Sequence, residues 1–302
     1  MKVVTGIQRK PFLAIIHGPV GSGKTHFGTT MPDPIFIAGE EIDNIESARL
    51  AKVTNWQQFL DQLTWVLEED HGYRTLVIDS MDSMERILER KILSENPTKT
   101  MATAYGGFGK AYQLMSEKFL SIREDYLVPI WDRGINVLLI CHTAKQSIDD
   151  LLRQESYQRY ELKLHKNSKG VGVSTVFSEF VMAVLMLSPD IIINRKDEKV
   201  YSESTGSRIL YCNAKPFLEA KNRYNMPDTI TINEGEGWNK VSPYINNFYM
   251  GIEGLKQDAI KLAKEKIKDQ ARLKKALSEI NKCDTRSKID KITSYLNGQD
   301  NG

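Results

Sequence analysis

Short runs of apolar residues alternate with longer amphipathic stretches through the first half of the chain. The apolar runs are 12–16, 35–37, 76–78 and 137–140. A run of this length is typical of a strand that is buried on both faces. Apolar residues at steps of three and four predict helices between the runs; they are Trp56, Phe59, Leu60, Leu63, Val66 and Leu67, then Met84, Ile87, Leu88 and Ile92. This alternation predicts an α/β fold with a mostly parallel central sheet flanked by helices.

The second half of the chain has a different pattern of apolar and charged residues. Further strands are predicted at 181–187, 208–212 and 229–232, where they could extend the same sheet. From Ile252 onward the chain has twelve basic and eight acidic residues on an amphipathic helical pattern. We therefore expect a core at 1–250 and a lysine-rich helical extension at 251–302. The extension is either a solvated helical hairpin or an appendage that binds DNA or a partner.

Composition narrows the function classes. With 302 residues, 41% of them hydrophobic and 26% charged, the chain has the profile of an ordinary globular protein. Its longest apolar run, 180–187, is far shorter than the roughly 18 to 20 residues that cross a bilayer, so no membrane segment and a cytoplasmic location are expected. The three cysteines lie far apart, which excludes a disulfide framework. A net charge of +2 removes the simplest argument for nucleic-acid binding, so any such claim depends on local patches.

The sharpest local signal follows the first predicted strand. The segment Gly18, Pro19, Val20, Gly21, Ser22, Gly23, Lys24, Thr25 fits the pattern of a phosphate-binding loop. Glycines let such a loop wrap a polyphosphate so that backbone N–H groups point inward. Lys24 is expected to reach the β and γ phosphates, and the Thr25 hydroxyl to bind Mg²⁺. Together with His26, this segment is the predicted nucleotide site, with ATP and Mg²⁺ as ligands.

Two other strands end in carboxylates. Asp79 follows the apolar run 76–78 and is the natural second ligand of the magnesium ion. Glu40 and Glu41 follow the run 35–37, where a base for the attacking water would lie. Glu40 is the first choice and Glu41 the alternative. An adjacent pair of exposed glutamates could equally begin the next helix.

The fourth predicted strand ends in Cys141, His142 and Thr143. A polar side chain at that edge of the sheet can contact the γ-phosphate, so His142 is a candidate sensor of the phosphate, although a histidine at a strand end is more often a surface or packing residue. No other His, Cys or acidic residue is spaced along the sequence to join His142 in a metal site.

With these pieces in order, the chain resembles the RecA-like recombinase ATPases, and most closely the phage nucleotide-binding proteins or Sak-type single-strand annealing recombinases. The similarity covers roughly residues 10 to 235. It rests on the loop 18–25, the strand ends at Glu40, Asp79 and His142, and a later Lys-Asn-Arg. The resemblance implies a RecA-like P-loop NTPase core. It also implies that Lys221 and Arg223 reach the γ-phosphate of a neighbouring subunit and act there as an arginine finger does.

Members of that family bind single-stranded DNA through two loops, and two stretches here have suitable chemistry. The stretch 96–116 contains Lys99, Tyr105, Phe108 and Lys110 among several glycines and no acidic residue. The stretch 145–173 is modestly basic and includes Lys163, Lys166 and Lys169. Each could equally be a structural segment, the first with its aromatic rings packed inward and the second a surface excursion.

The leading hypothesis is a Mg²⁺-ATP-dependent recombination ATPase of phage type that anneals or pairs single DNA strands. It would act as a homo-oligomer, a ring or a filament, in the cytoplasm of the host cell. A single-strand-binding protein is a further expected partner. The alternative is a nucleotide-gated regulatory or assembly module whose partner is protein, which the near-neutral charge favours.

Overall fold

The computed structural model describes residues 8–97, 99–150, 154–167, 172–196, 199–283 and 286–298. The chain divides into two compact units, Lys10–Ser242 and Pro243–Gly302, the second of which also includes the segment Met1–Arg9. The division falls inside helix α7 (Trp238–Tyr249). The assignment of 251–302 as a separate domain stays a prediction.

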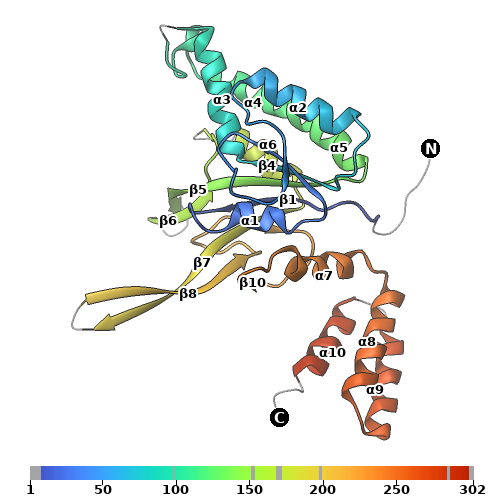
Figure 1. The fold of residues 1–302 in the computed structure, drawn as a ribbon. Coiled ribbons are helices and arrows are strands. Elements are labelled where there is room, and N and C mark those ends of the chain that lie inside the picture. The colour runs from blue at the N-terminus through green and yellow to red at the C-terminus, as the bar shows by residue number, and fades with distance from the viewer. Residues whose placement is uncertain are drawn as a thin grey trace. The chain divides into compact units, whose positions relative to one another are not determined.

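Ten strands of the described residues form one sheet in the larger unit (Figure 1). Its main path runs β10, β8, β7, β1, β5, β4, β2, β3, while β6 pairs with β5 and β9 with β7. The strands are β1 (Leu13–Gly18), β2 (Pro34–Ala38), β3 (Ala48–Arg49), β4 (Thr75–Asp79), β5 (Asn136–Asp150), β6 (Glu155–Leu162), β7 (Ala183–Lys196), β8 (Lys199–Tyr211), β9 (Lys221–Asn222) and β10 (Thr229–Ile232).

The parallel centre of the sheet gathers the predicted strand ends at one edge. Strands β7, β1, β5, β4, β2 and β3 are parallel neighbours in that order. In this register Gly18 lies beside His142, and Asp79 lies between Ala38 and Ile140. Because β5 separates β1 from β4, the loop after β1 and the carboxylate of β4 face each other across one strand. The predicted α/β fold class, with a mostly parallel sheet flanked by helices, is confirmed.

Helices cover both faces of this sheet. Figure 1 shows α2, α3, α4 and α5 together over one face and the short α1 over the other. These elements are α1 (Lys24–Thr29), α2 (Trp56–Glu68), α3 (Met81–Ser94), the turn η1 (Ala104–Gly106), α4 (Lys110–Ser121), the π-helical turn η2 (Ile122–Leu127), α5 (Val128–Asp132) and α6 (Val173–Phe180). One cluster of buried apolar side chains joins the helices from α2 to α6 to the strands, as the three- and four-residue spacing of α2 and α3 predicts.

Two hairpins depart from the sequence-based expectation. The sequence predicts that the fourth strand ends at 141–143, but β5 continues to Asp150 and pairs antiparallel with β6, so the stretch 145–173 begins as a hairpin. Strands β7 and β8 run beyond the sheet as an antiparallel arm with a register shift between Pro189 and Ile191. Both segments have many exposed side chains. For this reason the apolar-run signal does not reveal them.

The smaller unit is helical. It contains α8 (Ile252–Lys266), α9 (Gln270–Lys282) and α10 (Arg286–Gly298), which share an apolar core that includes Leu255, Ala263, Ile280 and Ile289. The amphipathic pattern after Ile252 thus corresponds to real helices. None of the helices in the described ranges combines the length and the apolar character that crossing a bilayer requires.

Candidate functional site

The loop between β1 and α1 holds its lysine in a folded-back position. Lys24 Nζ donates to the carbonyl oxygens of Gly18 and Pro19 at 3.0 and 2.8 Å and lies 3.4 Å from the Ser22 hydroxyl. Lys24 is buried, and burial lowers the pKa of its amine, although the nearby charge of Asp79 opposes that shift. A buried cation held only by neutral acceptors attracts an anion strongly. The loop therefore has the chemistry of a phosphate site, while His26 is exposed on α1.

Thr25 and Asp79 meet as the metal assignment requires. The Thr25 hydroxyl donates to Asp79 Oδ2 at 2.6 Å. Asp79 is nearly buried, so its pKa is raised, and the hydrogen bond from Thr25 works against that rise. A hydroxyl and a carboxylate oxygen are ligands that Mg²⁺ accepts while it keeps waters and phosphate oxygens as further ligands. The two residues fit a magnesium ion bound beside a nucleotide.

Local sequence explains why Asp79 is available for this role. Helix α3 is capped by Ser80, whose side chain accepts from the backbone N–H of Ser83, while the Ser83 hydroxyl accepts from the N–H of Ser80. The helix cap is thus the residue after Asp79. At the end of β2, Gly39 passes so close to this turn that a Cβ there would lie 2.3 Å from Ser83 Oγ. The close approach sets Glu40 beside the first turn of α3.

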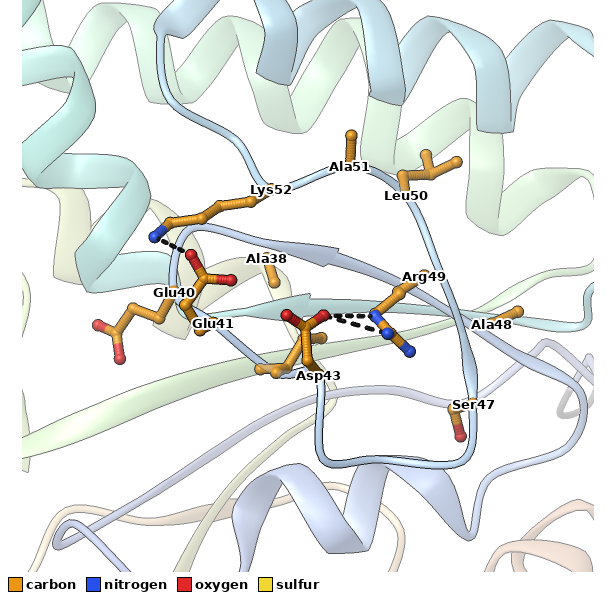
Figure 2. Close-up of a pocket in the computed structure, with 11 residues that line it drawn as sticks. Ala38, Glu40, Glu41, Asp43, Ser47, Ala48, Arg49, Leu50, Ala51 and Lys52 are labelled. Atoms are coloured by element: carbon orange, nitrogen blue, oxygen red, sulfur yellow. Dashed lines mark hydrogen bonds and ion pairs between the residues drawn. The ribbon is translucent and has the colours of Figure 1, made fainter.

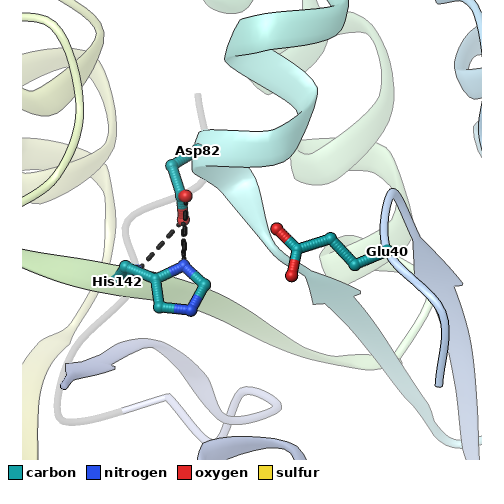
Figure 3. Close-up of side chains that lie close together, drawn as sticks. All are labelled: Glu40, Asp82 and His142. Atoms are coloured by element: carbon teal, nitrogen blue, oxygen red, sulfur yellow. Dashed lines mark hydrogen bonds and ion pairs between the residues drawn. The ribbon is translucent and has the colours of Figure 1, made fainter. Parts of the chain in front are cut away.

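Glu40 belongs to a cluster that sequence spacing did not reveal. Figure 3 shows Glu40, Asp82 and His142 converging from three elements, and one ligand atom of each lies within 4.8 Å of the others. The sequence predicted that no residue could join His142 in a metal site. That prediction is wrong, because two carboxylates lie close enough to His142 to share an ion with it. However, Arg86 already pairs with Glu40 at 2.7 Å and with Asp82 at 3.0 Å. Because this guanidinium supplies the positive charge, we interpret the cluster as a hydrogen-bonded network.

Within the network Asp82 orients His142. Its carboxylate accepts from the His142 backbone N–H at 3.0 Å and lies 3.1 Å from Nδ1. Burial alone raises the pKa of Asp82, but the hydrogen bonds from His142 outweigh burial and hold the pKa well below its usual range. An ionised carboxylate only accepts, so Nδ1 carries the proton and Nε2 remains for another partner. Asp82 and Arg86 lie on the first turns of α3, and their distance in sequence from His142 and Glu40 hid these contacts.

Glu41 faces a different environment. It pairs with Lys52 at 2.7 Å and lines a cavity of about 610 Å³ between the end of β2 and the segment Ser47–Lys52. Figure 2 shows the side chains of Glu40 and Glu41 diverging, with Glu41 directed to Lys52. Of the two sequence candidates, only Glu40 joins Asp82 of α3 and His142 of β5.

His17 is a functional candidate that the sequence analysis missed. It is fully buried on β1, next to the phosphate loop, with Nδ1 2.6 Å from the Thr143 hydroxyl and Nε2 2.9 Å from the Glu219 carbonyl oxygen. Since a carbonyl only accepts, Nε2 carries the proton and Nδ1 accepts from Thr143. Burial lowers the pKa of His17 to about 4. The sequence signal that could have revealed His17 is a polar residue in a strand of otherwise apolar residues.

Lys221 lies on β9, which pairs with β7, and Arg223 follows directly after that strand. Lys221 Nζ donates to the carbonyl oxygens of Ser178 and Glu179 at 2.7 and 3.0 Å, at the end of α6. Burial and the neighbouring Arg223 lower the pKa of Lys221. Both line a cavity of about 340 Å³ that Arg159 also borders. Among the described residues, no hydrogen bond or ion pair joins either side chain to the phosphate loop.

The first candidate DNA stretch presents two of its aromatic rings to solvent. Phe108 is fully exposed and Tyr105 is 39% exposed, although the Tyr105 hydroxyl donates to Glu95. Lys99 is exposed and Lys110 begins α4. Tyr112, in contrast, packs on the core and stacks on His165 with 4.2 Å between ring centroids. The inward-packing alternative thus holds for Tyr112 alone.

The second stretch lies beside His142. The backbone N–H of Lys163 donates to the His142 carbonyl oxygen at 2.9 Å, while its side chain is exposed. Lys166 pairs with the buried Glu161 at 3.1 Å. Lys169 lies outside the described residues. Through Lys163 this segment contacts the part of β5 that carries His142.

Comparison with known families agrees with this geometry. A family model described as an AAA domain matches residues 10–224, which is most of the chain. The chain belongs to the AAA-domain family. No curated protein matches it. As an AAA-domain protein it is a nucleotide-binding P-loop NTPase, and the matched range contains the phosphate loop, the strand ends at Glu40, Asp79 and His142, and the segment with Lys221 and Arg223.

Proposed function

We propose that this AAA-domain protein hydrolyses ATP at the phosphate loop and that hydrolysis serves a reaction on single-stranded DNA. The observation that supports the first part most strongly is the 2.6 Å hydrogen bond between Thr25 and Asp79, because it joins the loop to the carboxylate of β4. A Mg²⁺ ion held by these two oxygens would neutralise charge that develops on the phosphates.

In this proposal each residue of the site has one task. Lys24 leaves its carbonyl partners and binds the β and γ phosphates. Glu40 accepts a proton from the water that attacks the γ-phosphate, and the pairing with Arg86 holds its carboxylate toward α3. His142, oriented by Asp82, offers Nε2 to a γ-phosphate oxygen. Loss of the γ-phosphate therefore changes a contact at His142, within β5.

We propose further that the site is completed by a second copy of the chain. Lys221 and Arg223 make no polar contact with their own phosphate loop among the described residues, and Arg223 is exposed. The exposed Arg223 and the partly buried Lys221 are suited to stabilise the charge of the transition state in a neighbouring subunit. Hydrolysis then depends on assembly into a ring or filament.

The DNA part of the proposal rests on the resemblance to annealing recombinases together with two observations. The rings of Tyr105 and Phe108 are exposed on a glycine-rich segment, which suits base stacking. The segment at Lys163 contacts the His142 backbone, which offers a route from the phosphate to a second DNA contact. Annealing or pairing of strands is the reaction class that the resemblance favours.

A mobility-shift titration tests this function. A labelled single-stranded oligonucleotide is titrated with protein, with and without a non-hydrolysable ATP analogue, across a salt series. We expect binding that the analogue strengthens and that salt weakens. The variant Phe108→Ala should lower the affinity, while Tyr244→Ala, which removes an exposed aromatic ring on α7, serves as the matched control. An affinity for the oligonucleotide that changes with neither the nucleotide nor the salt concentration would favour the alternative, a nucleotide-gated module whose partner is protein.

A further inference from the structure

An arginine from outside the recognised motifs lies on the phosphate loop. Arg208 belongs to β8, which reaches the loop region because β8 pairs with β7 and β7 pairs with β1. A Cβ placed on Gly23 would lie 2.5 Å from Arg208 Nε and 3.1 Å from Cδ and Cζ. Gly23 also has a φ of +90°, a backbone conformation that favours glycine. The guanidinium end of Arg208 therefore packs directly against the backbone of the residue before Lys24.

Arg208 is held at a well-supported point of the sheet. It pairs with Pro189 of β7 on one side and with Ile232 of β10 on the other, where the sheet ends and the β7–β8 arm begins. The side chain is half-buried. A residue anchored between two strands keeps its direction better than one on a free loop.

The charge of this side chain has no partner. Within the part of the chain that the structure describes, no carboxylate lies within ion-pair distance of Arg208, and its guanidinium makes no hydrogen bond. Other arginines near the site are paired, as Arg86 is with Glu40 and Asp82. A half-buried, unpaired guanidinium on the phosphate loop, next to the residue that precedes the buried Lys24, attracts an anion of high charge density.

We propose that Arg208 is a phosphate-binding residue of the nucleotide site, supplied by the same chain. Its ligand is the polyphosphate of a nucleoside triphosphate, which it contacts next to Gly23 while Lys24 and the loop amides bind the same group. This inference rests on the proposed occupation of the loop by a nucleotide. It differs from the roles of Lys221 and Arg223, because Arg208 needs no second subunit.

A competition experiment separates phosphate contacts from contacts to the base. A fluorescent ATP analogue is titrated into wild-type protein and the variants Arg208→Ala, Arg208→Gln and Arg208→Lys, then displaced with inorganic tripolyphosphate. We expect the Ala and Gln variants to lose roughly 10-fold or more in affinity for both the analogue and tripolyphosphate. Arg208→Lys, which keeps the charge, should lose less. Arg90→Ala, which removes an exposed arginine of α3, is the matched control and should match the wild type.

Two outcomes overturn the proposal. If the Arg208 variants bind tripolyphosphate like the wild type, Arg208 contacts only the base or ribose, or merely packs on Gly23. If the analogue also binds normally, Arg208 has no binding role. Circular dichroism checks the fold of each variant, and a variant that fails to fold is replaced by the next in the series. Failure of the proposed function looks different, since Lys24→Ala would then bind tripolyphosphate as tightly as the wild type.

Discussion

Asp82 holds His142 by two contacts, from its carboxylate to the backbone N–H at 3.0 Å and to Nδ1 at 3.1 Å. The two residues lie on α3 and β5, so the carboxylate fixes both the backbone of the strand at His142 and the ring that projects from it. Arg86 extends the contact to Glu40. Through these four side chains the proposed base and the proposed phosphate sensor share one network.

Asp82→Asn tests whether this orientation matters for turnover. Loss of the ionised carboxylate removes charge-assisted hydrogen bonds, so we expect kcat for ATP to fall about 10-fold or more. KM for ATP should change little, because Lys24 and the loop still bind the phosphates. Steady-state phosphate release and thermal unfolding are measured together with Asp61→Asn, an exposed carboxylate on α2. A fall in stability with no separate effect on kcat would reduce Asp82 to a structural role.

Glu40→Gln and Glu41→Gln decide the identity of the base. The Glu40 side chain lies within 4.8 Å of the ligand atoms of Asp82 and His142, whereas Glu41 pairs with Lys52. We expect Glu40→Gln to bind ATP and to lose at least about 100-fold in hydrolysis, the range in which general bases contribute. Glu41→Gln should retain most of the wild-type rate. The reverse pattern would transfer the role to Glu41.

The buried His17 predicts a pH dependence of stability. Its pKa falls from 6.5 to about 4 on folding, so the unfolded chain binds more protons than the folded one between these values. Stability is therefore lost as the pH is lowered from 6.5, by a total of about 3 kcal/mol across the window. The lowered pKa of His165 adds a change of the same sign.

Urea unfolding between pH 5 and 6.5 measures this effect. His17→Gln should flatten the pH dependence of the free energy of unfolding, and His26→Gln, at an exposed position, should leave it unchanged. An unchanged slope in His17→Gln contradicts the assignment of a neutral buried imidazole between β1, Thr143 and Glu219.

Mixing two inactive variants tests the shared site. Lys24→Ala has a defective loop and an intact Lys221 and Arg223, while Arg223→Ala has the opposite defect. If the cations act on a neighbouring subunit, random assembly restores about one quarter of the interfaces and of the wild-type rate. If they act within one chain, the mixture is as inactive as its components.

The sequence predicted those strands whose own residues show that they are buried. The apolar runs at 12–16 and 76–78 and the pattern at 229–232 correspond to β1, β4 and β10. The loop 18–25 could be recognised because its chemistry depends on neighbouring residues of one segment.

Contacts between distant segments were beyond the sequence. Asp82 and His142 are sixty positions apart, and Gly23 and Arg208 are farther still, so no spacing rule joins them. The β5–β6 hairpin was missed because most of its side chains are exposed and polar. The buried role of His17 was missed because the strand was recognised from the apolar residues that precede it, and His17 is the one titratable residue of that strand.

The most direct test of the account is phosphate release from ATP as a function of Mg²⁺ concentration, for wild type, Lys24→Ala and Asp79→Asn. We predict Mg²⁺-dependent release by the wild type, loss of release in Lys24→Ala, and loss of the Mg²⁺ dependence in Asp79→Asn, with Asp125→Asn as an exposed control. Equal, Mg²⁺-dependent release by all four proteins would contradict hydrolysis at the loop that Thr25 and Asp79 join.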